Sequence, residues 1–201
     1  MIEKWEDMTV DDFEKVCRIM EEVDNIYDRQ VELIAVLDRR SIEDVLDMPL
    51  ADFKQRALRL DFLDDEPEKK VPPTTMLLNG NEYRVEYNAE KMTTAQFIDF
   101  QAYSKKGNDY VGLASVVVIP YDKKYGEYDM AEVHEDIRSM SIQNLISICF
   151  FFRLRLEGLL KASGDYVEKK LKKAMKKAKG ADKMKIGREI VKMRNLMSTL
   201  I

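Results

Sequence analysis

The sequence TMLLNGNEYRVEY, residues 75–87, decides the fold class of this chain. An Asn-Gly dipeptide between apolar, β-branched and aromatic runs is the strongest short-range signal for a β-hairpin. It predicts two strands, 75–78 and 82–87, on either side of a turn at Asn79-Gly80-Asn81. No other segment gives as clear a β signal. We therefore expect a mainly α protein with a small β-hairpin, that is, an α+β fold.

The hairpin needs a covering element. Tyr83, Val85 and Tyr87 alternate along the second strand and should share one face. An isolated hairpin is only marginally stable in water. We therefore expect it to pack on the helix that begins at Thr93 or Thr94, whose apolar residues are Phe97, Ile98, Phe100, Ala102 and Tyr103.

Residues 1–63 carry helical patterns and predict an N-terminal bundle of three or four helices. Thr9 is a good N-cap, followed by Asp11 and Asp12 where the helix dipole favours carboxylates. Ser41-Ile42-Glu43-Asp44 is a capping box, and Pro49 is suited to start the next helix. The apolar stripes expected to face the core are Phe13, Val16, Cys17, Met20, Val23; Ile26, Tyr27, Val31, Ile34, Ala35, Leu37; and Phe53, Ala57, Leu60, Leu63.

Two connecting segments separate these patterns. Residues 64–73, DDEPEKKVPP, predict a Pro-rich charged linker, because three prolines and six charges cannot build a core. Residues 110–119, YVGLASVVVI, are ambiguous: Val116 to Ile119 favour a strand, whereas the whole run equally fits a buried helix stopped by Pro120. We favour the helix, because no partner strand is evident beyond the hairpin. A polar loop at 121–129 then leads to Asp129, which should cap a helix through Val133 and Ile137.

The longest helix is expected over residues 141–178, capped by Ser141 and ended by Gly180. Its first half has a core-like pattern of Leu145, Ile146, Cys149, Phe150, Phe152 and Leu156. Its second half is a basic amphipathic helix with Val167, Leu171, Ala174, Met175 and Ala178 on its apolar side. The candidate partner-binding lysines are Lys169, Lys170, Lys172, Lys173, Lys176, Lys177 and Lys179. A further basic helix is expected at 182–199.

Phe150, Phe151 and Phe152 place aromatic bulk all round one helical turn. A monomeric amphipathic helix would keep one side polar. Either the helix is central to its domain, which we expect, or this run is an apolar interface with another chain in an oligomer.

Charge is sorted along the sequence. Residues 1–68 carry 9 Lys+Arg against 21 Asp+Glu, a net of −12, and residues 161–195 carry 13 against 4, a net of +9. Two surfaces of opposite sign suit assembly, with partners or with each other. The organisation expected is an acidic helical subdomain (1–63), the linker (64–73), a hairpin-plus-helices domain (74–160) and a basic helical tail (161–201).

The basic tail has four alternative interpretations: a solvated helix, or a binding surface for an acidic protein, nucleic acid or anionic lipid. Lysine dominates it, and no aromatic residue follows Tyr166. Base stacking and bidentate base readout are therefore disfavoured.

Catalytic and metal-binding patterns are weak. His134, the one histidine, lies beside Glu135 and Asp136, which we assign to the solvated face of a helix. Cys17 and Cys149 lie in apolar helical patterns and are expected as buried thiols of a reducing compartment. No glycine-rich phosphate-binding motif or nucleophile elbow occurs in the sequence. We predict neither enzymatic activity, nor a cofactor, nor a metal site.

The sequence shows neither a signal peptide nor a membrane-spanning segment, so we do not expect a membrane partner. Its first residues are acidic, and the most apolar run, Leu145 to Leu160, is interrupted by Arg153, Arg155 and Glu157. That run is also shorter than the ~20 residues that span a bilayer. We expect a soluble protein made in a cytoplasm.

The order of segments resembles that of small proteins from tailed bacteriophages of gut Bacteroides, including crAss-like phages. The resemblance covers residues 5–155 and leaves the basic tail outside. No single motif carries it; the segments in order are Trp5, Met8-Thr9, Ser41-Ile42-Glu43-Asp44-Val45, Met48-Pro49-Leu50, Leu60-Asp61-Phe62-Leu63, Leu78-Asn79-Gly80-Asn81-Glu82-Tyr83, Thr94-Ala95-Gln96-Phe97-Ile98-Asp99-Phe100 and Lys124-Tyr125-Gly126-Glu127-Tyr128-Asp129.

The resemblance implies a non-enzymatic virion or tail-assembly protein that binds other phage structural proteins in the host cytoplasm. A tail-assembly chaperone would cover an aggregation-prone partner with helical grooves. The alternative is a cargo protein packaged in the capsid or tail, with its basic helices facing DNA or an acidic lumen.

Overall fold

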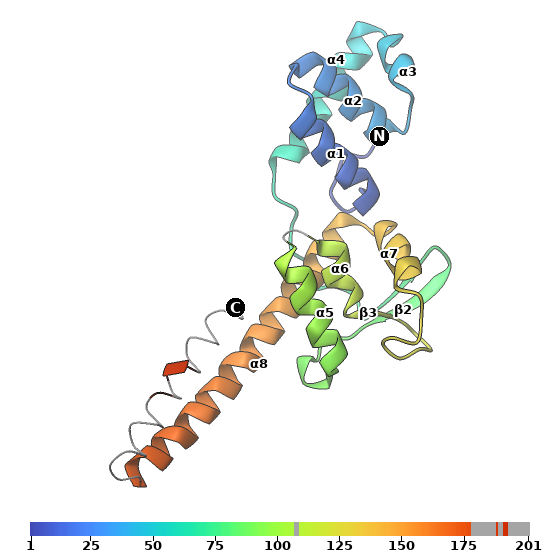
Figure 1. The fold of residues 1–201 in the computed structure, drawn as a ribbon. Helices are drawn as coiled ribbons and strands as arrows, with labels where there is room; N and C mark the ends of the chain where they lie inside the picture. Colours follow the sequence, from blue (N-terminus) through green and yellow to red (C-terminus); the bar gives the residue numbers. More distant parts are fainter. Residues whose placement is uncertain (107–108, 178–187, 189–190, 193–201) are drawn as a thin grey trace. The chain divides into compact units, whose positions relative to one another are not determined.

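The computed structural model describes residues 1–106, 109–177, 188 and 191–192 (Figure 1). It confirms the predicted α+β class: helices dominate, and the described strands form one small antiparallel sheet. The elements are α1 (Val10–Glu22), α2 (Ile26–Asp38), α3 (Ile42–Leu46), α4 (Leu50–Leu58), a 3-10 helix η1 (Arg59–Asp64), β1 (Thr75–Leu78), β2 (Asn81–Val85), a 3-10 helix η2 (Ala89–Lys91), α5 (Thr94–Lys105), α6 (Tyr110–Ser115), β3 (Val118–Pro120), α7 (Met130–Arg138) and α8 (Ile142–Lys177).

The chain divides into two compact units. The first contains residues 1–86 and 93–151, and so holds the N-terminal helices, the sheet, α5 to α7 and the beginning of α8. The second contains residues 87–92 and 152–201, of which the described part is η2, the rest of α8 and residues 188 and 191–192.

Local capping signals place the N-terminal helices as predicted. The Thr9 hydroxyl accepts from the Asp12 N–H and the Asp12 carboxylate accepts from the Thr9 N–H, which closes a capping box on α1. Ser41 and Asp44 do the same for α3. Pro49 is the N-cap of α4 rather than its first helical residue, so that prediction was wrong by one position.

The predicted apolar stripes of α1 and α2 are partly wrong. Ile19 and Leu33 are buried instead of Met20, Ile26 and Tyr27. The last two are 62 % and 70 % exposed, because Asn25 caps α2 and its first turn lies at the end of the helix pair rather than over the core.

The hairpin turn has the geometry its sequence requires. Leu78 pairs with Asn81, so the turn itself is Asn79-Gly80, with φ of 48° and 86°. Both values are positive, as in the type I′ turn that Asn-Gly favours. Asn81 therefore belongs to β2, which ends at Val85 and excludes Tyr87.

The run at 110–119 is both helix and strand. Residues 110–115 form α6, as we preferred, but residues 118–120 form β3, which pairs antiparallel with β2. The expectation of a helix through Ile119 was wrong because the missing partner strand is the free edge of the hairpin. Val116, Val117, Val118 and Ile119 are all buried.

Helices cover the buried parts of this sheet. Helix α6 contacts α5 and α7, and lies between them in Figure 1. Tyr83 on β2 reaches α7, where its hydroxyl donates to Asp136 at 2.6 Å. Helix α5 instead meets the chain between α6 and β3, since Gln96 Nε2 donates to the Val116 carbonyl at 2.8 Å.

The 64–73 segment begins with Asp64, the last residue of η1, and continues without helix or strand, but it is held in place. The Lys70 N–H donates to Ser147 Oγ and Gln143 Nε2 donates to the Glu68 carbonyl, so the first turns of α8 bind its backbone. The start of α8 is also attached to the N-terminal region: Thr9 and Ser141 form a short β-bridge, and the Ile142 N–H donates to Met8 O at 2.8 Å. The segment is therefore part of the first unit and not a free connector.

The long helix is present as predicted, over 142–177 with Ser141 Oγ accepting from the Asn144 N–H. Leu145, Ile148 and Phe152 are buried, whereas Phe150 is exposed. The helix expected at 182–199 lies outside the described residues, apart from positions 188 and 191–192.

Candidate partner-binding surface

One side of α8, apolar except at the exposed Ser163, follows one repeat along the whole helix. Its members are spaced by eleven residues in three series: Leu145, Leu156, Val167; Cys149, Leu160, Leu171; and Phe152, Ser163, Ala174. An eleven-residue repeat corresponds to about 3.67 residues per turn, close enough to a straight helix to keep these side chains in one stripe. We call these nine residues the α8 stripe.

Burial changes along the stripe. Leu145, Phe152 and Leu156 are at most 5 % exposed, whereas Val167 is 41 % exposed and Ala174 is exposed. Leu160 and Leu171 are half-buried. The stripe therefore continues beyond the part of α8 whose side chains are packed.

Lysines surround the exposed half of the stripe. Lys169, Lys170, Lys172, Lys173 and Lys176 are exposed; Lys177 lies in the last turn of α8, and Lys179 lies outside the described residues. Lys172 pairs with Glu168 at 2.6 Å, and Lys170 Nζ lies 4.7 Å from the Tyr166 ring centroid. No described carboxylate pairs with Lys169, Lys173 or Lys176.

These lysines do not share one face. At 3.6 residues per turn, Lys170 and Lys173 lie roughly 60° and 120° from Val167 around the helix, beside the stripe. Lys169 and Lys176 lie roughly 160° and 180° away, on the far side. The first pair can therefore contact a partner seated on the stripe, and the second pair cannot.

The three phenylalanines differ in their surroundings. Phe152 is buried, Phe151 is half-buried, and the exposed Phe150 ring has Lys69 Nζ 4.7 Å from its centroid. Phe150 also packs edge-on against Phe151 at 5.7 Å. The run thus continues from the packed side of the helix to a side partly covered by the 64–73 segment.

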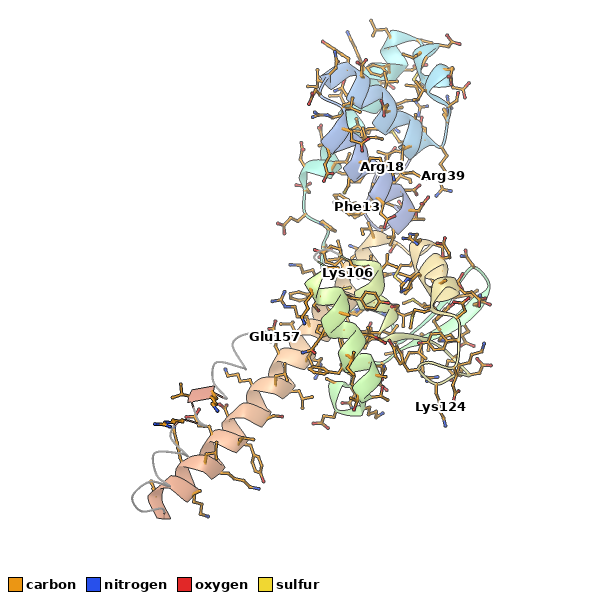
Figure 2. The ribbon with its side chains drawn as sticks, viewed as in Figure 1. Phe13, Arg18, Arg39, Lys106, Lys124 and Glu157 are labelled. Carbon is orange, nitrogen blue, oxygen red and sulfur yellow. The ribbon has the colours of Figure 1, made fainter. Side chains whose placement is uncertain are left out.

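An open pocket of about 980 Å³ lies in the first unit, among α1, α2, α3 and α7. Five carboxylates and four cations line it: Asp11, Asp12, Glu32, Glu43, Glu135, Lys15, Arg39, Arg40 and Arg138. Figure 2 labels Arg39, whose Nη2 lies 3.5 Å from Asp12. The other cations also have carboxylates within 4 Å, so the pocket offers no concentrated charge of one sign.

His134 is a partly buried residue with structural contacts. Its Nε2 lies 3.0 Å from Ser115 Oγ, and its ring packs edge-on against Tyr103 at 5.9 Å. Burial lowers its pKa below the usual 6.5, so the ring is neutral at pH 7. Ser115 Oγ in turn donates to the Gly112 carbonyl at 2.7 Å, so these contacts connect α7 with α6.

The two cysteines are free and half-buried. Burial raises the pKa of Cys149 to about 12, and burial together with Glu21 and Glu14 raises that of Cys17. Both are therefore thiols at pH 7, which makes them poor nucleophiles.

Asp136 is the residue whose role we misjudged from the sequence. It is buried rather than on the solvated face, whereas its neighbour Glu135 is exposed as expected. Its carboxylate accepts from Asn79 Nδ2 at 2.9 Å, Asn81 Nδ2 at 2.8 Å and the Tyr83 hydroxyl at 2.6 Å. Burial alone would raise its pKa, but these three hydrogen bonds outweigh it and the pKa is lowered.

This cluster fastens the hairpin to α7. Both oxygens of the Asp136 carboxylate accept hydrogen bonds, and burial and Asp136 both raise the pKa of Tyr83. The two asparagines at the turn were the available signal, because a turn residue with a side-chain amide can bind a distant carboxylate as well as its own backbone.

No group of three or more His, Cys, Asp or Glu side chains in the described part of the chain is arranged to hold a metal ion. Of the helices within residues 1–106 and 109–177, none is long and apolar enough to cross a membrane.

Comparison with known proteins finds no match to a family model, to a curated protein or to a solved structure. What the surfaces can bind therefore follows from their own chemistry, and the exposed half of the α8 stripe is the strongest candidate.

Proposed function

We propose that this protein is a non-enzymatic assembly factor of a tailed bacteriophage, which acts by binding other phage structural proteins through the exposed half of α8. The observation that carries the proposal is that the α8 stripe continues, at unchanged spacing, beyond its buried part. An apolar stripe costs solubility unless something covers it, and amphipathic helices commonly bind partners in this way.

The chemistry of the stripe favours a protein over a nucleic acid. Burying a Val or Leu side chain contributes about 1.5–3 kcal/mol, a gain that a phosphate backbone cannot provide. Lys170 and Lys173 beside the stripe favour a partner with carboxylates around an apolar centre. Such a partner is an acidic amphipathic surface, and covering it during assembly in the host cytoplasm is the work of a chaperone.

One observation favours the alternative of a packaged virion protein that contacts DNA. Lys169 and Lys176 extend the positive charge to the far side of α8, where a partner bound to the stripe would not contact it. Non-specific binding to phosphates needs charge alone and tolerates any face of a helix. The context of a phage rests on the ordered segments described above.

Mass spectrometry of purified phage particles separates these functions. An assembly factor is absent from mature particles, and particles made without it lack tails or are malformed in electron micrographs. A packaged protein is present in every particle. Normal, infectious particles made in its absence would contradict the assembly role.

Matched charge reversals then identify the face that acts. Lys170→Glu with Lys173→Glu changes the side beside the stripe, and Lys169→Glu with Lys176→Glu makes the same charge change on the far side. The proposal predicts that only the first pair fails to restore assembly. Equal failure of both pairs, with DNA affinity that falls steeply with salt, would favour the packaged protein.

A further inference from the structure

A second surface of this chain is complementary to the exposed half of the α8 stripe. It also exposes apolar side chains, and the charge around them is negative rather than positive. Residues 20–28, which comprise the end of α1, the connection to α2 and the first residues of α2, carry the exposed apolar side chains Met20, Ile26 and Tyr27. Its charged residues are all acidic: Glu21, Glu22, Asp24 and Asp28. We call residues 20–28 the acidic turn.

The carboxylates of the acidic turn form no ion pair with the described residues. All four are exposed, and none has a cationic partner within 4 Å among the described residues. The nearest arginine in sequence after the turn, Arg29, donates its Nε to the Val23 carbonyl at 2.8 Å. The turn therefore presents an apolar centre with unneutralised negative charge around it.

The exposed half of α8 has a similar apolar centre with charge of the opposite sign beside it. Val167 and the half-buried Leu160 and Leu171 form its apolar centre, and Lys170 and Lys173 lie beside them. Each surface by itself exposes apolar side chains to water, and each carries the charge that the other lacks.

We propose that the acidic turn of one copy of this protein docks on the exposed half of the α8 stripe of a second copy. This contact deepens the proposed function, on which it rests in part because both use α8. It joins two different surfaces, so two copies that exchange it reciprocally form a closed pair, and copies that repeat it in one direction form a ring or an open filament.

Reversing the charge of either surface should abolish the contact. Variant A carries Asp24→Lys and Asp28→Lys, and variant B carries Lys170→Glu and Lys173→Glu. The four residues are exposed, so folding should be preserved, which circular dichroism and thermal unfolding would check. Variant A takes the acidic turn from four negative charges to a net of zero and so removes the attraction, and variant B places like charges opposite each other. Each variant alone should weaken self-association at least about tenfold in dissociation constant.

Mixing the two variants provides the decisive arm. The acidic turn of B then meets the unchanged α8 of A, and the reversed turn of A meets the reversed α8 of B. The first contact is that of the wild-type chain, and the second sets the two introduced lysines against the two introduced glutamates, so sedimentation velocity of an equimolar mixture should recover the assemblies of the wild-type chain. Control variants with the same charge changes elsewhere, Asp61→Lys with Asp64→Lys and Lys169→Glu with Lys176→Glu, should assemble like the wild type.

Several results would overturn this inference. One is a wild-type chain that stays monomeric at every concentration; another is a mixture of A and B that stays monomeric. A third is a change of hydrodynamic radius in A or B without any change in mass, which would place the acidic turn on α8 of the same chain. If self-association fails while variant B alone loses assembly activity with other phage proteins, the proposed function stands and only this contact is wrong.

Discussion

The two halves of α8 carry the same apolar repeat and differ in what covers it. In the first half, Leu145 and Phe152 are almost fully buried and the charged neighbours are few. In the second half, Val167 remains exposed between lysines. The repeat thus places the apolar side chains on one side of α8, and the packing of the first half determines how many of them are buried. We propose that a partner covers the part of the apolar stripe that the core leaves exposed.

The largest expected effect tests this contrast directly. Leu145→Ala opens a cavity in the core of the first unit and should cost about 2–5 kcal/mol of the free energy of unfolding. Val167→Ala on the same series of the stripe should change it by less than about 0.5 kcal/mol in the isolated protein. Urea denaturation of both variants is the measurement. Similar losses would mean that the second half is packed like the first.

The next largest effect concerns the carboxylate that fastens the hairpin. Asp136→Asn replaces an acceptor of three hydrogen bonds with a group that also donates, and should cost about 2 kcal/mol at pH 7. Exposed Asp61 is the matched control, and Asp61→Asn should stay within about 0.5 kcal/mol of the wild type.

The same variant has a pH signature. The folded-state pKa of Asp136 is lowered from 3.8, so its stabilising contribution is present above that value and is lost as the pH falls through the folded pKa. The gap in stability between wild type and Asp136→Asn should therefore narrow below pH 3.8. A gap that widens in acid would show that the carboxylate is protonated in the folded protein.

A smaller effect is expected at His134. Burial lowers its folded pKa below 6.5, so the wild-type chain should lose stability as the pH falls below that value. His134→Gln keeps a polar group near Ser115 Oγ but does not titrate, so its stability should vary less between pH 7 and 5. Thermal unfolding across that range would measure the difference, and parallel curves for the two proteins would refute the assignment.

Two glycine substitutions should change stability in opposite directions, and the one in α8 has the smallest expected effect. A Cβ at Gly158 in α8 has nothing within 4 Å, so Gly158→Ala should stabilise the helix by about 0.5–1 kcal/mol. A Cβ at Gly112 in α6 would overlap the Tyr103 ring, so Gly112→Ala should instead destabilise the first unit by about 1–3 kcal/mol. Helical circular dichroism and urea denaturation would separate the two signs.

The sequence predicted what short-range chemistry determines. Thr9, Ser41 and Asp129 cap the helices at which we placed them, and Asn79-Gly80 makes the expected turn, because each signal involves residues within a few positions of one another. The fold class follows from these local signals together with the helical periodicity of the remainder.

Long-range relations were harder to predict. β3 is a strand only because it meets the edge of β2, and Asp136 is buried only because the hairpin turn reaches α7. Likewise, periodicity could not show that Ile26 and Tyr27, in the first turn of α2, are exposed rather than packed in the core. The candidate lysines were identified from the sequence, but their division into two faces required a continuous helix.

Amide hydrogen exchange along α8 in the full-length protein tests the central claim most directly. At low concentration, residues 145–152 should be strongly protected and residues 160–176 weakly protected, since only the first stretch is packed. Raising the concentration, or adding the phage partner, should increase protection in 160–176 and leave 145–152 unchanged. Strong, concentration-independent protection of both stretches in the dilute protein would contradict the account, because the stripe would then already be covered.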